Sequence, residues 1–123
     1  MSAADTLPRE ELLRSSAGLR GAPALPLSAW RGTSGRRYVV SVFQAREIEP
    51  DDLVDAVVIA VRRDGQGFSN GIAKADQVTT IDDADTARAF LAVLPKTITE
   101  LHLHRIEPDA NERARIVDDL RPE

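Results

Sequence analysis

The two histidines of the chain form an H-x-H pair, and this pair is the first candidate for chemistry. His102 and His104 lie in "TELHLHRI", a segment typical of a strand, so their side chains point to one face about 7 Å apart. Two imidazoles could share a metal ion, but structural zinc takes four ligands and catalytic zinc usually three protein ligands. Glu100 is a third candidate on the same face, and no HExxH or similar spacing completes the set. We therefore predict half-buried structural histidines, with no metal and no other cofactor.

Motifs for nucleophilic catalysis and phosphate binding are also missing. No G-x-S-x-G places a serine at a strand-to-helix elbow, and Ser34 and Ser69 fall in predicted turns. The segments "GTSGRR" and "DGQGFSNG" contain glycines, but neither is a P-loop or a G-x-G-x-x-G that opens a helix. The chain has no cysteine, which excludes disulfides and thiolate chemistry. We predict no catalytic residue from these patterns.

Paired arginines are the most function-like feature of the sequence. Arg36 and Arg37 begin one predicted strand, and Arg62 and Arg63 end the next. If these strands are antiparallel neighbours, the four side chains gather at one end of the sheet, where Arg31 could join them. Guanidinium groups bind phosphate through two parallel hydrogen bonds, so the five arginines predict an anion-binding or nucleic-acid-binding surface. The alternative is a solvated sheet end paired with some of the 20 acidic residues.

The elements that would position these side chains follow from hydrophobic periodicity. We expect strands over 38–43, 56–61, 72–78 and 97–106, and helices over 79–95 and 107–120. The unbroken apolar run 56–61 favours a central strand, whereas the weaker 72–78 favours an edge. Asp82 or Asp83 could cap the first helix. The buried stripe of the second helix is predicted to be Ala110, Ala114, Val117 and Leu120. The order β-β-β-α-β-α predicts an α+β fold, a small mainly antiparallel sheet of about four strands with helices packed on it.

Length and charge bound the remaining possibilities. The 123 residues suit a single domain over 30–123, preceded by a flexible arm over 1–29 that includes a short helix over 8–20. The segment "GAPALPLSAW" predicts an extended arm anchored by Trp30. A net charge of −4 gives no long-range positive field, although a local basic patch remains open. With neither a secretory signal nor an apolar run of about 20 residues, we expect a soluble cytoplasmic protein.

Residues 30–120 resemble a bacterial group of GIY-YIG-like domains. The likeness lies in the order of elements and in "GTSGRRYVVSVF", "ITELHLHRI" and "RARIVDDL". Members of that group open with a strand of the type SGxxYxFxVY and close with a helix of the type RxxIExDL. The resemblance implies a family made up largely of metal-dependent nucleases. Their sites use tyrosines of the GIY and YIG strands, an arginine on the next helix and a metal-binding glutamate on a later helix.

Carried over residue by residue, the nuclease site is incomplete in this sequence. The GIY segment falls on residues 56–58, so that Val58 replaces its tyrosine, and the YIG segment falls near 71–73 without a tyrosine. Arg88 stands where the family has its arginine, and Val117 where it has its glutamate. A valine offers no oxygen to magnesium and cannot move a proton. The resemblance thus implies a domain that has kept the scaffold and lost the nuclease.

Three functions follow as hypotheses. The first is a non-catalytic binding or regulatory module that contacts nucleic acid or another protein through the arginines. The second is a divergent metal-dependent nuclease. The third is a protein-interaction or homodimeric subunit that uses Trp30 and the exposed edge 72–78. In the first hypothesis, His102 and His104 would lie beside the arginines. In the second, Tyr38, Arg88, His102, His104 or Asp118 would take the place of the lost nuclease residues.

Overall fold

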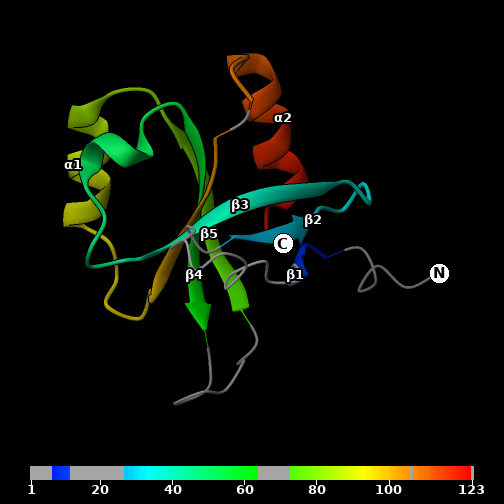
Figure 1. Cartoon of the computed structure of the whole chain (residues 1–123), viewed down its shortest axis with the longest axis horizontal. Helices are drawn as coiled ribbons and strands as arrows, with labels where there is room; N and C mark the ends of the chain where they lie inside the picture. Colours follow the sequence, from blue (N-terminus) through cyan, green and yellow to red (C-terminus); the bar gives the residue numbers. More distant parts are fainter. Residues whose placement is uncertain (1–6, 12–26, 64–72, 106, 123) are drawn as a thin grey trace, which may run out of the picture.

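The computed structural model describes residues 7–11, 27–63, 73–105 and 107–122. These residues form six strands, two α-helices and one short 3₁₀ helix, η3 (Figure 1). The strands are β1 (Arg9–Glu11), β2 (Leu27–Arg31), β3 (Arg37–Gln44), β4 (Ala56–Arg63), β5 (Ala73–Ile81) and β6 (Glu100–His104). The helices are η3 (Pro50–Leu53), α1 (Ala84–Ala92) and α2 (Ala110–Leu120).

All strands belong to one antiparallel sheet, with the order β1-β2-β3-β6-β4-β5. The late strand β6 enters between β3 and β4, which are consecutive long strands in the chain. The sheet curls, and its two edge strands β1 and β5 come close to each other. The expected α+β class and mainly antiparallel sheet are therefore confirmed.

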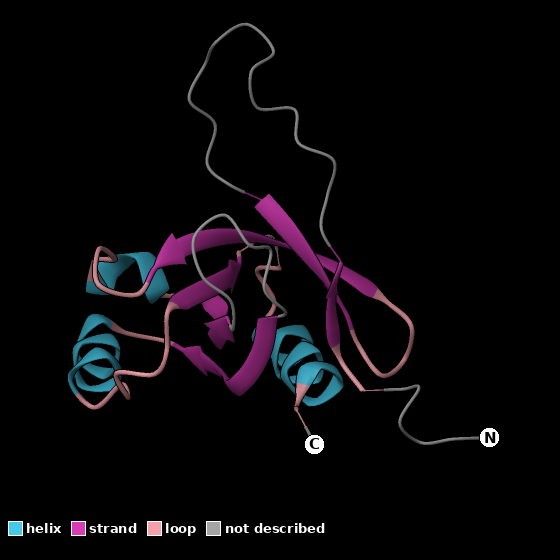
Figure 2. Ribbon diagram, turned by 90° about the horizontal axis from the view of Figure 1, so that it is seen from below, coloured by secondary structure: helices cyan, strands magenta, loops and turns pink. Residues whose placement is uncertain are grey.

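The two helices cover opposite faces of the curled sheet (Figure 2). Strand β4 shows why both faces must be covered, because its residues alternate between two apolar clusters. Val57, Ile59 and Val61 pack with α2 on the inner face, whereas alanines and Val58 pack with α1 and η3 on the outer face. The apolar run of β4 predicted a central strand; β4 is buried and paired on both sides, but it lies next to the edge strand β5 rather than at the centre of the sheet.

Local capping signals set the helix boundaries. Of the two expected caps, Asp83 begins α1, and its carboxylate accepts a 2.7 Å hydrogen bond from the backbone N–H of Thr86. Asp109 caps α2 in the same way through Asn111. The predicted stripe of α2 was partly wrong. Its buried residues are Arg113, Ile116, Val117 and Leu120, whereas Ala110 and Ala114 are exposed. Burying isoleucine removes more apolar area from water than burying alanine, which favours this rotation.

The sheet has six strands rather than about four, and both additional strands come from the N-terminal third. Residues 9–11 form a strand where a short helix was expected, and the rest of that expected helix lies outside the described residues. Strand β2 lies in the segment expected to be an irregular arm, and its Trp30 is 1% exposed. Pairing with β3 satisfies the backbone of β2 and buries this indole, so tertiary contacts override the weak local preference. Within the described ranges, no helix has the length and apolar character needed to cross a membrane.

Candidate anion-binding surface

The five predicted arginines do not form one cluster. Because β6 lies between β3 and β4 and is antiparallel to both, these two strands run in the same direction. Arg37 begins β3, whereas Arg63 ends β4, so the two residues lie at opposite ends along the strands. The predicted cluster required β3 and β4 to be antiparallel neighbours, and this prediction is wrong. The sequence could not show this, because β6 follows β4 by more than 35 residues in the chain and still inserts between β3 and β4.

Three arginines line up across the first three strands. Arg9 is paired directly with Arg31 across β1 and β2, and Arg31 directly with Arg37 across β2 and β3. Neighbouring strands lie about 4.8 Å apart, so the row spans about 10 Å. We call Arg9, Arg31 and Arg37 the arginine ladder. Two of its members were predicted site residues, and Arg9 was missed because its segment was expected to be helical.

One carboxylate serves the whole arginine ladder. Glu11 lies 2.7 Å from Nε of Arg31, 3.3 Å from Nε of Arg37 and 3.5 Å from Nη2 of Arg9. The hydrogen bond from Arg31, assisted by the charges of all three arginines, holds the pKa of Glu11 below its usual value. The same hydrogen bond raises the pKa of Arg31. Three guanidinium groups around one glutamate leave a local surplus of two positive charges.

The arginine ladder is open to solvent. The side chains of Arg9, Arg31 and Arg37 are 57%, 35% and 46% exposed. Arg36, in the turn that precedes β3, is also exposed, and no ion pair joins it to another described residue. Predicted residues Arg31, Arg36 and Arg37 thus lie at one end of the sheet. Their guanidinium groups can contact an anion there without unfolding any part of the described structure.

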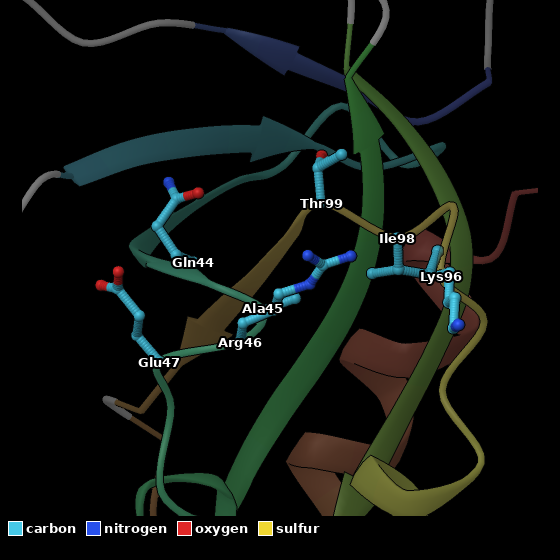
Figure 3. Close-up of a pocket in the computed structure, with 7 residues that line it drawn as sticks. All are labelled: Gln44, Ala45, Arg46, Glu47, Lys96, Ile98 and Thr99. Atoms are coloured by element: carbon cyan, nitrogen blue, oxygen red, sulfur yellow. The ribbon is translucent and has the colours of Figure 1, made fainter.

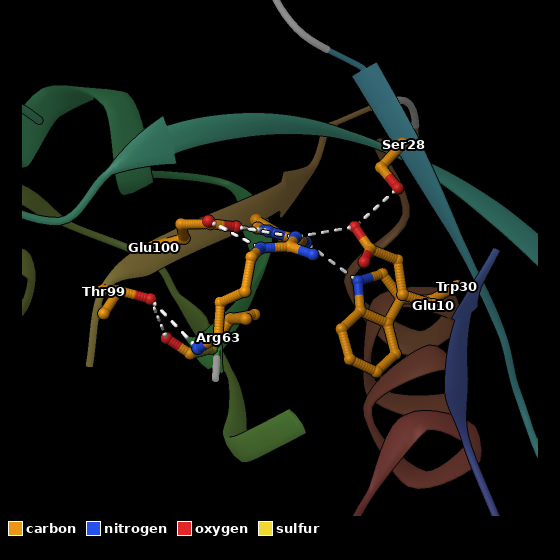
Figure 4. Close-up of polar contacts among 8 residues, drawn as sticks. Glu10, Ser28, Trp30, Arg63, Thr99 and Glu100 are labelled. Carbon is orange, nitrogen blue, oxygen red and sulfur yellow. Dashed lines mark hydrogen bonds and ion pairs between the residues drawn. The ribbon is translucent and has the colours of Figure 1, made fainter. Parts of the chain in front are cut away.

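Arg62 and Arg63 form ion pairs with acidic residues outside the arginine ladder. Arg63 forms two hydrogen bonds of 2.8 and 3.0 Å with Glu100 and a third of 3.1 Å with Glu10 (Figure 4). Glu10 also accepts a 2.7 Å hydrogen bond from the hydroxyl of Ser28. Arg62 lies 3.4 Å from Asp76 of β5. For Arg62 and Arg63, the alternative prediction of a sheet end paired with acidic residues is confirmed, and the prediction that they share a basic surface with the other arginines is wrong.

His102 ends the same polar network and is fully buried. Its Nε2 lies 2.8 Å from Glu100, and its Nδ1 accepts a 2.9 Å hydrogen bond from the Trp30 indole. Burial by itself would raise the pKa of Glu100, but the hydrogen bonds from His102 and Arg63, together with the charge of Arg63, lower it to about 2. With both ring nitrogens engaged, His102 has no lone pair for a metal ion. His104 is also buried, at 7% exposure, and its Nδ1 bonds the Val39 carbonyl oxygen at 2.8 Å.

Tyr38 is held by Asp119 rather than poised for catalysis. The Tyr38 hydroxyl donates a 2.7 Å hydrogen bond to Asp119, which also accepts hydrogen bonds from Thr33 and Ser34. Burial, reinforced by the bond to Asp119, raises the pKa of Tyr38 to about 12. The phenol therefore stays protonated near neutrality. This bond network joins the turn over residues 32–36 to the end of α2.

The remaining candidates for the divergent nuclease site do not join Tyr38. Arg88 is exposed on α1, pairs with Asp85 and lies on the outer side of the sheet, opposite the inner face that carries Tyr38 and the histidines. Asp118 is exposed and pairs with Arg121 at 3.4 Å. Among the residues that the structure describes, no group of three or more histidines and carboxylates could hold a metal ion.

Neither family models nor curated proteins nor solved structures match this chain. The resemblance to GIY-YIG-like domains therefore stays a prediction. Two positions to which the nuclease site would map are core residues, since Val58 is 0% and Val117 is 8% exposed. Function must accordingly be argued from the side chains themselves, and the arginine ladder is the described feature that most needs a functional explanation.

Proposed function

We propose that the protein is a non-catalytic binding module of GIY-YIG-like fold that contacts nucleic acid through the arginine ladder. One observation carries the proposal, namely three directly opposed arginines on adjacent strands sharing a single glutamate. Like charges placed directly opposite each other across strands destabilise a sheet. Glu11 offsets only part of this repulsion, and a polyanion would offset the remainder.

The state of the other polar side chains supports a binding role over catalysis. Tyr38 is a protonated hydrogen-bond donor to Asp119, and His102 has both nitrogens occupied. A general base or a metal ligand needs a free lone pair directed at a ligand. The described residues with catalytic potential instead bond to each other inside the fold.

The chemistry of the surface also indicates which part of a nucleic acid it would contact. Of the described aromatic residues, Trp30 and Tyr38 are buried on the inner face, away from the ladder. Because neither of these two rings lies beside the ladder, contact there would be made to phosphates and would be independent of sequence. Three phosphate contacts predict that log K falls with log salt concentration with a slope of about −2 to −3.

Fluorescence anisotropy tests the proposal directly. Labelled single- and double-stranded DNA and RNA are titrated with the protein at several salt concentrations, without divalent metal. We expect Arg9→Ala and Arg37→Ala to weaken binding and to reduce the salt slope by about one each. Glu11→Gln should act in the opposite direction and strengthen binding, because it removes the carboxylate that competes with phosphate.

Arg88→Ala is the matched control, since it removes an exposed arginine from α1, outside the ladder. An equal loss in Arg88→Ala would show that net charge alone matters, and absence of binding at low salt would contradict the proposal. Addition of Mg²⁺ or Mn²⁺ to the same mixtures tests the divergent nuclease. Cleavage that depends on Tyr38 would favour that alternative over a binding module.

The edge position of β5 favours a homodimer as a second candidate. Strand β5 has a sheet partner on one side only, as predicted from its weak apolar pattern, although β1 lies close to part of its other side. Trp30, the other expected contact, is buried in the core and cannot take part. Light scattering at high protein concentration decides this case, and a monomer would contradict it.

A further inference from the structure

A cleft at the far end of β3 is a second place where positive charge lacks a partner. The cleft lies between the turn that follows β3 and the turn that precedes β6, which are joined by a 3.1 Å hydrogen bond from Ala45 N–H to the Thr99 carbonyl oxygen. Its volume is about 300 Å³ (Figure 3). It is lined by Gln44, Ala45, Arg46, Glu47, Lys96, Ile98 and Thr99.

The two cations of this cleft differ from most basic residues of the protein. Arg46 and Lys96 are exposed, and no carboxylate in the described ranges forms an ion pair with either of them. Figure 3 shows the Arg46 guanidinium directed toward the side where Ile98 and Lys96 lie, while the Glu47 carboxylate points away from it. Among the described residues, those that pair with a carboxylate include Arg9, Arg31, Arg37, Arg62, Arg63, Arg88, Arg113, Arg115 and Arg121.

The walls of the cleft combine this charge with apolar surface. Ile98 is 3% exposed and belongs to the outer core cluster, against which Ala45 also packs. A volume of about 300 Å³ is at the small end of the range for ligand pockets. Unpaired cations beside the partly exposed Ala45 suit a ligand with one anionic end and a short apolar part.

We propose that this cleft binds a small organic anion, either a carboxylate or a phosphate monoester. Arg46 and Lys96 pair with its charged group, and its apolar part contacts the partly exposed Ala45, beside the nearly buried Ile98. The site is separate from the arginine ladder, because Arg37 begins β3 and Gln44 ends it. The two proposals can therefore be tested independently of each other.

Amide proton–nitrogen NMR spectra of the intact protein test this site with three probes, namely phenyl phosphate, benzoate and inorganic phosphate. We expect saturable shifts at residues 44–47 and 96–99 with at least one organic probe, and the better of the two identifies the anionic group. Inorganic phosphate should bind more weakly because it has no apolar part that could contact Ala45. Arg46→Ala or Lys96→Ala should weaken binding by at least about tenfold.

Arg105→Ala is the matched control, since Arg105 is exposed, has no ion pair with a described residue and lies outside the cleft. Unchanged binding in this variant supports the site, and an equal loss overturns it. Shifts that do not saturate, or that lie elsewhere in the chain, also overturn it. Inorganic phosphate binding as tightly as both organic probes would refute an organic ligand. Nucleic-acid binding by Arg46→Ala should match that of the wild-type protein, which separates this result from the fate of the ladder.

Discussion

The indole nitrogen of Trp30 donates a 2.9 Å hydrogen bond to Nδ1 of His102, across 72 residues of sequence. An indole N–H can only donate, so this imidazole nitrogen must carry a lone pair. The proton of His102 therefore lies on Nε2, which donates to Glu100 at 2.8 Å. A neutral imidazole thus links β2 to the partly buried ion pair of Arg63 and Glu100, and it connects strands that are far apart in the sequence.

Substitution of His102 should lower the stability of the protein substantially. His102→Leu leaves the Trp30 N–H without its acceptor and removes a hydrogen bond from Glu100, at about 1–3 kcal/mol for each buried group. We expect the free energy of unfolding to fall by about 2–4 kcal/mol. Urea denaturation followed by the fluorescence of Trp30, the single tryptophan of the chain, measures this. His102→Gln is the matched variant, because its amide can both accept and donate, and it should lose less. A loss below about 1 kcal/mol in His102→Leu would show that the link is dispensable.

Acid should destabilise the protein in a window set by Glu100. Its pKa falls from the usual 4.5 to about 2 in the folded state, so the folded protein holds this carboxylate ionised more strongly than the unfolded chain does. The stabilisation is complete above pH 4.5 and is lost as pH falls toward about 2. Its size is roughly 3 kcal/mol. Urea midpoints measured across this range should decrease as pH decreases.

Glu100→Gln is the control for this loss of stability at acidic pH. This variant should be less stable at neutral pH, because Arg63 loses its ionised partner. Its stability should nevertheless change less between pH 4.5 and 2, since the titrating group is gone. If the urea midpoint of this variant decreased between pH 4.5 and 2 as steeply as that of the wild-type protein, the effect would belong to other carboxylates.

Tyr38 should ionise well above the usual range. Burial and the hydrogen bond to Asp119 raise its pKa from 10 to about 12, so the neutral phenol is favoured in the folded state. This stabilisation is complete below pH 10 and is lost as pH rises toward 12. The chain has one tyrosine, so tyrosinate absorbance reports this group alone. Asp119→Asn should lower the midpoint while burial keeps it above 10, and an unshifted midpoint near 10 in the wild-type protein would contradict the buried bond.

The turn before β3 should not tolerate a side chain at Gly32. A Cβ at this position would clash with the Asp119 carboxylate and lie 2.9 Å from the Asp119 carbonyl oxygen. The carboxylate cannot easily move, because Thr33, Ser34 and Tyr38 all donate hydrogen bonds to it. Gly32→Ala should therefore cost about 1–3 kcal/mol in urea denaturation. The same substitution should cost less in an Asp119→Ala background, and strict additivity of the two losses would argue against the contact.

Local patterns in the sequence determined much of the sheet and the presence of both α-helices. The helix expected over 79–95 was too long, because residues 79–81 continue strand β5 and α1 covers Ala84–Ala92. The apolar run of β4, the aspartate that caps α1 and the alternation in β6 each depend on residues close together in the chain, so periodicity and capping chemistry identify them. The alternation also placed His102 and His104 on a common face, as the structure shows. The depth of their burial could not be predicted, because it depends on β2, β3 and α2 covering that face.

Only the tertiary structure decided which arginines meet. Strand β1 is three residues long and has no apolar alternation, so nothing local distinguishes Arg9 from a residue in a helix or a loop. Its place beside Arg31 results from pairing with β2, and the separation of Arg37 from Arg63 results from β6 inserting between β3 and β4. Strand pairing satisfies backbone groups that are far apart in the chain. The sequence alone therefore determined strands β3 to β6 and both α-helices in outline, whereas long-range strand pairing decided β1, β2 and the arginine ladder.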